Sequence, residues 1–548
     1  MTNPGDGDFQ RLLDSPGRSE ETTRQLHVLE HRTATDRLWD ALATTPERER
    51  VVRAIGPIAV VLLAAGTRLW NLGSPKTLVF DETFYVKDAY TLSKLGYEGS
   101  WPANPDPGFA AGNVNTYLTP GSFVVHPPLG KWIISLGYDW LGVTNPVSWR
   151  IMTAIVGILA VVLLMMIAKY LFKSTLVATI AGFLMAIDGN AIVMSRVGLL
   201  DNFVMFFALL GFGAVLLDRQ WTAVRFSAWM VRRENRGKGT SWGPTLWWRP
   251  WLILAGLAFG LDSAVKWNGI YFLAGFALYA LGVDIIQRYK TSKIWITNTL
   301  FKQGPANFLL MVPIAIAGYM VTWTGWFVTK GGYNRNFADQ PGNAWVGPLA
   351  WVPHSLQSWW NFEIQVWNYN INEHSPHPYA ANPFTWLLMI RPTSMYFTSA
   401  NYGQHGCTVS FCGSSITGIA NPLIWYAAVA AAVYLVYRLI RYREWRVALI
   451  LAGLAAGYVP WLFYSNRTVF QFYTIAFEPY LLLALAFVVA QLIGKRGDPE
   501  YRRAIGMRWI AVFLVACVAI SIFFWPLWTG MQIDFKYMQL HYWLPSWE

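Results

Sequence analysis

The chain has 548 residues, of which 54% are hydrophobic and only 14% are charged. Few soluble domains of this length are so poor in charge, so the composition argues against a soluble enzyme and favours a protein that crosses a membrane many times. The net charge of +12 follows the placement of Lys and Arg around apolar segments, and nucleic-acid binding is therefore not expected.

Residues 1–50 are polar and contain no apolar stretch typical of a signal sequence, so we expect a flexible cytoplasmic tail. The rest, 51–548, shows no internal repeat and no low-complexity linker, which predicts a single membrane domain. Apolar runs of about twenty residues, the length that spans a bilayer, recur along it. We predict an all-α fold with about eleven membrane-spanning helices near 54–70, 149–168, 174–190, 200–217, 250–266, 268–286, 304–323, 421–437, 447–465, 469–493 and 509–527.

Lys and Arg are distributed unequally between the segments that connect these runs. One alternating set of five segments holds 22 of the 43, whereas the other set covers far more of the chain and holds only 10. Positive charge marks the cytoplasmic side of a membrane protein. We therefore predict a cytoplasmic N-terminus, an outer C-terminus and two long outer loops, 71–148 and 324–420, that carry surface helices.

The first outer loop contains two adjacent carboxylates, Asp81 and Glu82, at the start of an amphipathic stretch. One interpretation is structural, because acidic residues in a first helical turn cap free amides and complement the helix dipole. The other is functional, because carboxylates at the lipid–water boundary that face intramembrane cations mark candidate sites for a lipid-borne substrate. Their position favours the functional interpretation.

Three cations lie near the outer ends of predicted spans: Arg68, Arg150 and Lys266. A charge at this depth needs a partner, either a protein carboxylate or a bound phosphate, unless the side chain extends to water. We expect Arg68 to extend to water. Both interpretations stay open for Arg150 and Lys266, and the two apolar runs that flank Lys266 could also form one long helix.

Further polar residues mark the outer segments. His126 precedes two prolines that fix an extended turn, and a lone histidine in such a turn is usually structural. Asp201 begins the fourth span, where by itself it is expected to cap the helix. His374 and His377 are three residues apart in the second outer loop, but prolines interrupt helical spacing and no cysteine joins them, so no zinc site is expected.

Two of the three cysteines, Cys407 and Cys412, also lie in the second outer loop, where the compartment permits a disulfide, and we expect them to form one. Cys517 lies within a span and is expected to be a packing residue. Two intramembrane acids, Asp188 and Asp262, have no assigned role.

Together these segments resemble one family, the protein O-mannosyltransferases in their bacterial, actinobacterium-like form, which belong to the GT-C class of membrane glycosyltransferases. The matching stretches follow the order of that family along nearly the whole chain. They are Phe80-Asp81-Glu82, His126-Pro127-Pro128-Leu129-Gly130-Lys131, Ser195-Arg196 with Leu199-Leu200-Asp201, Val265-Lys266-Trp267, Thr322-Trp323 with Gly325-Trp326-Phe327, His377-Pro378-Tyr379, Arg391-Pro392, and Pro460-Trp461-Leu462 with Arg467.

The resemblance implies transfer of one mannose from polyprenyl-phosphate-mannose to Ser or Thr hydroxyls of exported polypeptides. It implies an inverting reaction at the outer face of the plasma membrane, without a metal or another cofactor. Two departures stand out. Eukaryotic relatives insert a sugar-binding-like domain into the long outer loop, for which this loop has no room, and the family's Gly-Asn-Pro is replaced by Ala420-Asn421-Pro422.

The implied chemistry assigns roles to the candidate residues. A hydroxyl is a weak nucleophile and needs a carboxylate base, for which we choose Asp81, while Glu82 supports the catalytic loop by pairing with Arg150. A fixed cation stabilises the departing lipid phosphate, and Lys266 is preferred over Arg467 and Arg150. The acceptor or sugar site is expected to contain His126, Asp201, His374, His377 and Tyr379.

Two other classes of function stay open on the sequence. A related GT-C enzyme would transfer the sugar to a lipid or a cell-wall glycan instead of a protein. A secondary transporter would show inverted repeats, broken helices and carboxylates in the middle of its spans. Because we find no such repeat, the transporter is the weaker alternative.

Overall fold

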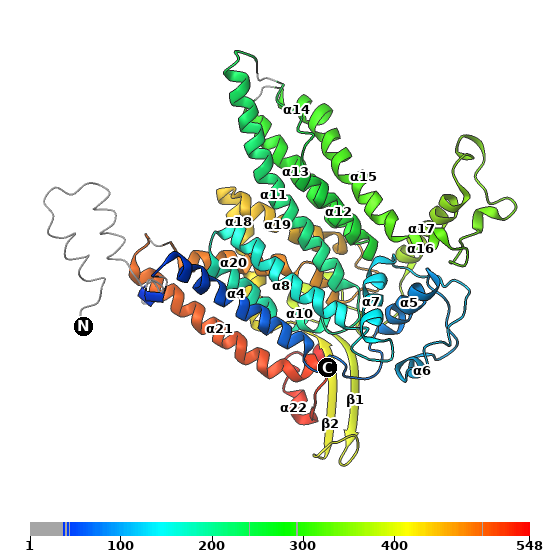
Figure 1. Cartoon of the computed structure of the whole chain (residues 1–548). Helices are drawn as coiled ribbons and strands as arrows, with labels where there is room; N and C mark the ends of the chain where they lie inside the picture. The colour runs from blue at the N-terminus through cyan, green and yellow to red at the C-terminus, as the bar shows by residue number, and fades with distance from the viewer. Residues whose placement is uncertain (1–36, 39–40, 43, 240–241, 292–293, 496) are drawn as a thin grey trace.

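The computed structural model of the chain is mostly helical (Figure 1). It describes residues 37–38, 41–42, 44–239, 242–291, 294–495 and 497–548. Most of the predicted tail, 1–50, lies outside the described residues, and helix α4 already begins at Pro46.

Each predicted apolar run overlaps an apolar helix, although α20 begins only at Glu478, within the predicted run 469–493. Eight helices in the described part of the chain are long and apolar enough to cross a bilayer, whereas α9, α12 and α20 are shorter. The multi-pass membrane class is therefore confirmed, and the number of eleven spans stays a prediction. The helices are α4 (Pro46–Leu69), α8 (Ile151–Phe172), α9 (Thr175–Ile187), α11 (Asp201–Glu234), α12 (Pro250–Val265), α13 (Gly269–Tyr289), α15 (Gly304–Thr322), α18 (Pro422–Tyr442), α19 (Trp445–Leu462), α20 (Glu478–Ile493) and α21 (Glu500–Thr529).

The two runs around Lys266 form two helices, α12 and α13, and not one. The backbone of Lys266 is extended, and α13 begins three residues later at Gly269. A Cβ at position 269 would lie 2.3 Å from the backbone nitrogen of Ser263, so only glycine allows the chain to turn back this tightly against α12. This break places the buried Lys266 at the end of a helix that packs between α11 and α15.

The two long loops that were predicted to lie outside, 71–148 and 324–420, both carry helices. These lie together at one end of the bundle, on the right in Figure 1. The shorter helices of the chain are α5 (Glu82–Leu95), α6 (Asp106–Ala110), α7 (Leu129–Leu141), α10 (Gly189–Met194), α14 (Trp295–Asn298), α16 (Thr324–Val328), α17 (His354–Asn372), α22 (Phe535–Gln539), the π-helix η1 (Thr299–Gln303) and the 3-10 helices η2 (Phe337–Asp339), η3 (Gly347–Leu349), η4 (Pro383–Leu388), η5 (Gln471–Ala476) and η6 (Pro545–Trp547).

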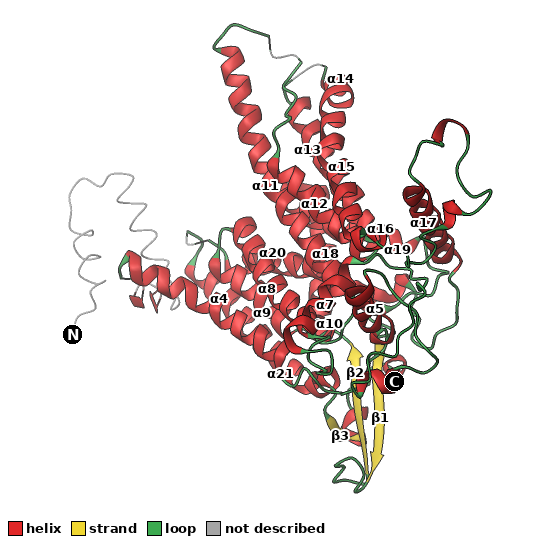
Figure 2. Cartoon of the chain, turned by 45° about the vertical axis from the view of Figure 1, so that its right-hand side comes forward, coloured by secondary structure: helices red, strands yellow, loops and turns green. Residues whose placement is uncertain are grey.

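A small antiparallel sheet projects from the helices (Figure 2). It consists of β1 (Thr393–Asn401), β2 (Phe411–Gly418) and β3 (Gln532–Asp534) in the order β1-β2-β3. The sequence analysis did not predict these strands, which add to the mostly helical class. The predicted disulfide between Cys407 and Cys412 is confirmed and closes the loop between β1 and β2.

The two intramembrane acids have different surroundings. The carboxylate of Asp188 accepts hydrogen bonds from the backbone nitrogens of Asn190 (2.8 Å) and Asn421 (3.0 Å), so it joins the start of α10 to the start of α18. Asp262 is fully buried, and neither of its carboxyl oxygens has a hydrogen-bond partner among the described residues.

The prediction that Arg68 extends to water is wrong, because its side chain is buried. Its guanidinium donates to the backbone oxygens of Met185 and Ala186.

Candidate active site

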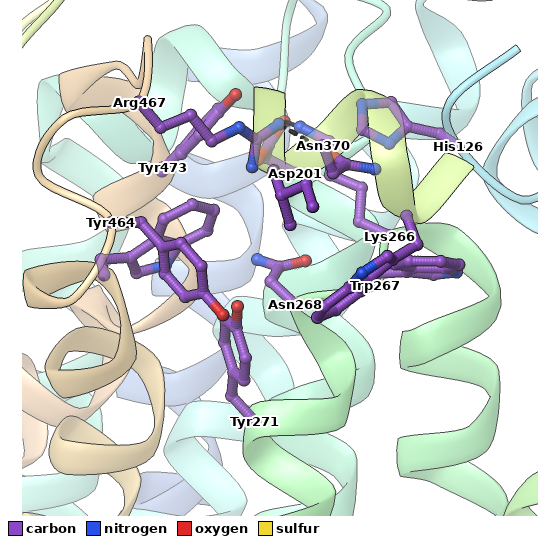
Figure 3. A pocket seen from close by; sticks show the side chains of 13 residues that line it. His126, Asp201, Lys266, Trp267, Asn268, Tyr271, Asn370, Tyr464, Arg467 and Tyr473 are labelled. Carbon is purple, nitrogen blue, oxygen red and sulfur yellow. Dashed lines mark hydrogen bonds and ion pairs between the residues drawn. The ribbon is translucent and has the colours of Figure 1, made fainter. Parts of the chain in front are cut away.

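A pocket of about 70 Å³ with charged and polar side chains lies where the ends of several helices meet (Figure 3). Its walls come from segments far apart in the sequence, including the starts of α11 and α13, the end of α17 and the loop after α19. The lining residues are His126, Asp201, Lys266, Trp267, Asn268, Tyr271, Trp367, Asn370, Ile371, Trp461, Tyr464, Arg467 and Tyr473.

Lys266 and Asp201 form a buried ion pair in this pocket. The Lys266 Nζ lies 2.7 Å from the Asp201 Oδ2 and 4.7 Å from the centre of the Tyr473 ring. The prediction that Asp201 caps its helix is wrong, because Leu200 holds the N-cap position and the Asp201 carboxylate turns to Lys266 instead. The charge of Lys266 is therefore held in place by a protein carboxylate.

Arg467 faces the same pocket from the loop after α19. Its Nη2 donates to the Asn370 Oδ1 at 2.7 Å, which ties this loop to the end of α17. The Nε of Arg467 is buried and has no hydrogen-bond partner among the described residues. A buried cationic donor without a partner is costly, so this geometry suits an anionic ligand.

Asp81 lies beside the pocket and is not one of its lining residues. It holds the N-cap position of α5, yet its side chain makes no capping hydrogen bond, so the structural interpretation as a helix cap does not apply to it. The Tyr85 hydroxyl donates a long hydrogen bond of 3.4 Å to the Asp81 Oδ2. Burial raises the pKa of Asp81 to about 6, although the nearby charge of Lys266 opposes the shift. A carboxyl with such a pKa can accept a proton near neutral pH.

Glu82 and Arg150 pair as predicted, and both are buried. The Arg150 Nε and Nη2 donate to the two oxygens of Glu82 at 2.7 and 2.8 Å. Glu82 also accepts from the backbone nitrogens of Val79 and Gly198, each at 2.8 Å. The third guanidinium nitrogen of Arg150, Nη1, donates to backbone oxygens, including that of Pro75 at 2.9 Å.

This network joins the outer loop 71–148 to the segment before α11. Arg150 does not line the pocket and its donors are occupied, so its position supports a role in holding the loop more than the predicted role as a phosphate ligand. Glu82 likewise supports the loop and does not face the pocket. Of the two adjacent carboxylates, Asp81 is therefore the one available for chemistry.

His126 lines the pocket, and its assignment to the acceptor or sugar site stays a prediction. Burial lowers its pKa well below the usual value, and the charges of Lys266, Lys131 and Arg467 lower it further, so the imidazole is neutral. Its ring centre lies 5.8 Å from that of Tyr85, which links the pocket to Asp81. Lys131 donates to the backbone oxygen of His126 at 2.9 Å and pairs with Glu98.

The other three predicted site residues do not line the pocket. His374 is exposed, and its Nδ1 lies 2.9 Å from the backbone oxygen of Asn466. The His377 ring packs against Phe470 with centres 4.9 Å apart, and Tyr379 lies under the guanidinium of Arg391. These residues shape the loop beside the pocket, so their assignment to a sugar site is not supported by their positions.

Several lining residues escaped the sequence analysis, including Asn268, Tyr271 and Asn370. A usable signal was present for Asn370, because the segment 361–372 places five amides among aromatic residues in an outer loop. Polar residues at that density favour a helix that faces a polar site.

An apolar groove of about 480 Å³ adjoins the polar pocket, and Trp267 and Trp367 line both. It runs between α12, α15 and α17, and its walls are aliphatic and aromatic with few exceptions. One exception is Glu363, whose Oε1 accepts a hydrogen bond from the Tyr319 hydroxyl at 2.7 Å. Burial raises the pKa of Glu363 to about 7. A charged pocket beside an apolar groove suits a ligand with an anionic head and an apolar tail.

The fold resembles that of the S. cerevisiae protein O-mannosyltransferase Pmt1-Pmt2 complex bound to the sugar donor. The TM-score is 0.66 at 14% sequence identity, over 90% of this chain and 92% of that chain. This likeness shows a multi-pass membrane fold of the GT-C type.

Sequence comparisons identify the family. A model described as dolichyl-phosphate-mannose-protein mannosyltransferase matches residues 58–328, and one described as the C-terminal four TMM region of protein-O-mannosyltransferase matches 355–547. The chain is 31% identical to a polyprenol-phosphate-mannose–protein mannosyltransferase of Mycolicibacterium smegmatis (strain MKD8), over 89% of this chain and 92% of that protein. A protein of the same name from Mycobacterium tuberculosis (strain ATCC 25618 / H37Rv) is 30% identical, with coverages of 89% and 90%. The chain belongs to the protein O-mannosyltransferase family.

Proposed function

We propose that the chain transfers mannose from polyprenyl-phosphate-mannose to Ser or Thr hydroxyls of exported polypeptides, at the outer face of the plasma membrane. The observation that carries this proposal is the meeting of three features: two cations with available donors, an apolar groove, and a carboxylate with a raised pKa. The names of the relatives support the same donor and a protein acceptor.

The donor phosphate binds between Lys266 and Arg467. The ammonium of Lys266 has three N–H donors, of which Asp201 takes one, so the others are available to phosphate oxygens. The unpartnered Nε of Arg467 supplies another donor. The polyprenyl chain then lies along the neighbouring apolar groove, because Trp267 and Trp367 form a common wall of both.

Asp81 is the general base. The hydroxyl oxygen of the acceptor attacks the anomeric carbon of mannose as its proton passes to the Asp81 carboxylate, and the bond from that carbon to the phosphate oxygen breaks. The departing phosphate keeps the electron pair, and Lys266 and Arg467 stabilise its added charge. One displacement of this kind inverts the anomeric configuration and needs no covalent intermediate. Tyr85 contacts both this base and the neutral His126, which lines the pocket together with the cations.

The orientation follows from the distribution of positive charge. With the Lys- and Arg-rich connections in the cytoplasm, the pocket and both long outer loops face outward. This places the reaction on the side where exported polypeptides emerge.

The proposal is tested by incubating membranes that contain the protein with labelled polyprenyl-phosphate-mannose and a Ser/Thr-rich peptide, followed by mass spectrometry. We expect hexose on the peptide, and none on a matched peptide in which alanine replaces every Ser and Thr. Hexose that appears on lipid instead would indicate the related GT-C enzyme that modifies a lipid or glycan.

A further inference from the structure

The strand β1 has a free edge. It pairs with β2 along one side, and no other strand of the described residues pairs with its second side. Figures 1 and 2 both show β1 as the outer strand of a hairpin that extends beyond the helices. Every second residue of such an edge turns its backbone N–H and C=O outward, where they are available to another chain.

This edge lacks the usual protection against pairing. Strand edges are commonly blocked by charged residues or proline, yet β1 reads Thr-Ser-Met-Tyr-Phe-Thr-Ser-Ala-Asn and contains neither. A register irregularity between Ser394 and Tyr396 affects only its base, and residues 396–401 pair regularly with β2. Three consecutive residues of this regular part, 397–399, are exposed. The edge is therefore open to an added strand.

The hairpin is held rigid, so its edge is formed before any partner arrives. The Cys407–Cys412 disulfide closes the tip, and Cys412 lies opposite Ala400 in the ladder. On its other side β2 pairs with β3, and all of its residues except Phe411 are buried. An ordered edge binds an extended peptide without the entropic cost of ordering a loop.

The base of β1 lies next to the active site. A Cβ added at Gly418, the residue opposite Thr393, would lie 3.6 Å from the Thr393 oxygen and 3.8 Å from the Cβ of Phe472. The Phe472 ring lies 5.7 Å from that of Phe80, which directly precedes Asp81, and 5.9 Å from the Lys266 Nζ. The Phe472 side chain thus lies near the start of β1, near the residue that precedes Asp81, and near the phosphate-binding Lys266.

We propose that the acceptor polypeptide binds the free edge of β1 as an additional strand and continues past Thr393, so that its Ser or Thr hydroxyl reaches Asp81. Main-chain hydrogen bonds provide the affinity in this mode of recognition, whereas any specificity comes from pockets for alternate side chains. The site therefore accepts extended, disordered segments of varied sequence. This inference rests on the proposed function, because it specifies how the acceptor of that reaction binds.

The test uses one good acceptor peptide with a single Ser and a set of variants, each with one backbone N-methyl group. N-methylation removes one N–H donor and leaves the side chains unchanged. We expect the KM for the peptide to rise about fivefold to tenfold at alternate positions on one side of the Ser, as for loss of one hydrogen bond. The intervening positions serve as controls, and the KM for the lipid donor stays unchanged.

A photo-crosslinking residue in the same peptide gives a second measurement, and we expect its adducts at residues 396–401. The inference is overturned if the unmodified peptide receives mannose while KM shows no alternation, or if the adducts map elsewhere. Crosslinks between two copies of β1 would also overturn it, since the edge would then be a dimer interface. If no peptide receives mannose at all, the proposed function itself fails.

Discussion

Removing the charge of Lys266 has two separable consequences. The Lys266–Asp201 pair is buried, so Lys266→Met leaves the Asp201 carboxylate buried without a cation. Breaking a buried pair in this way costs about 3–5 kcal/mol of folding stability. The same change removes a charged hydrogen bond to the donor phosphate, worth about 1.5–3 kcal/mol, so kcat/KM for the lipid donor should fall about 10- to 100-fold.

The double variant Lys266→Met with Asp201→Asn separates these effects. It removes both charges and is expected to recover most of the thermal stability of the purified protein, because no unpaired charge remains. Donor kcat/KM should stay as low as in the single variant, while KM for the acceptor peptide changes little. Lys330→Met, at an exposed outer position, is the control and should behave as wild type. Recovery of donor kinetics together with stability would refute phosphate binding by Lys266.

Three further predictions address the base, its support and the topology. Asp81→Asn should lower transfer about 10²- to 10⁴-fold without loss of folded protein. Because the pKa of Asp81 is raised to about 6, wild-type kcat/KM should fall as the pH drops through this value and the base becomes protonated, and a flat profile between pH 5 and about 7.5 would contradict the assignment. Glu82→Gln and Arg150→Gln should each impair activity, and their combination should be much less than additive because the two side chains form one network. A cysteine at Glu500 should react only with reagent from the cytoplasm and one at Asn115 only from outside, and the reverse labelling would invert the topology.

The sequence predicts the membrane helices well, because about twenty apolar residues have few alternatives to a helix in a bilayer. It misses the sheet for a physical reason. Strand β2 contains Gly413, Ser414 and Ser415, which have low strand propensity, and it pairs with β3 more than a hundred residues later. The contacts of β2 with β3 join distant segments, and no local pattern records them.

The candidate site was predicted in part. The Glu82–Arg150 pair followed from the need of a buried charge for a partner. The same rule left the partner of Lys266 open, because Asp201 is 65 residues away and stands where a helix cap is expected. His374 and His377 were placed in the site by motif, yet their rings face the surrounding loop. Residue type indicated which side chains carry chemistry, whereas their direction depends on packing.

The most direct test of the account is transfer by purified protein in liposomes that contain polyprenyl-phosphate-mannose and a Ser/Thr-rich peptide, with wild type and Asp81→Asn measured side by side. The account predicts hexose on Ser or Thr of the peptide with wild type, and at least about 100-fold less with Asp81→Asn at equal amounts of folded protein. Equal transfer by the two proteins, or hexose on lipid and none on peptide, would contradict it.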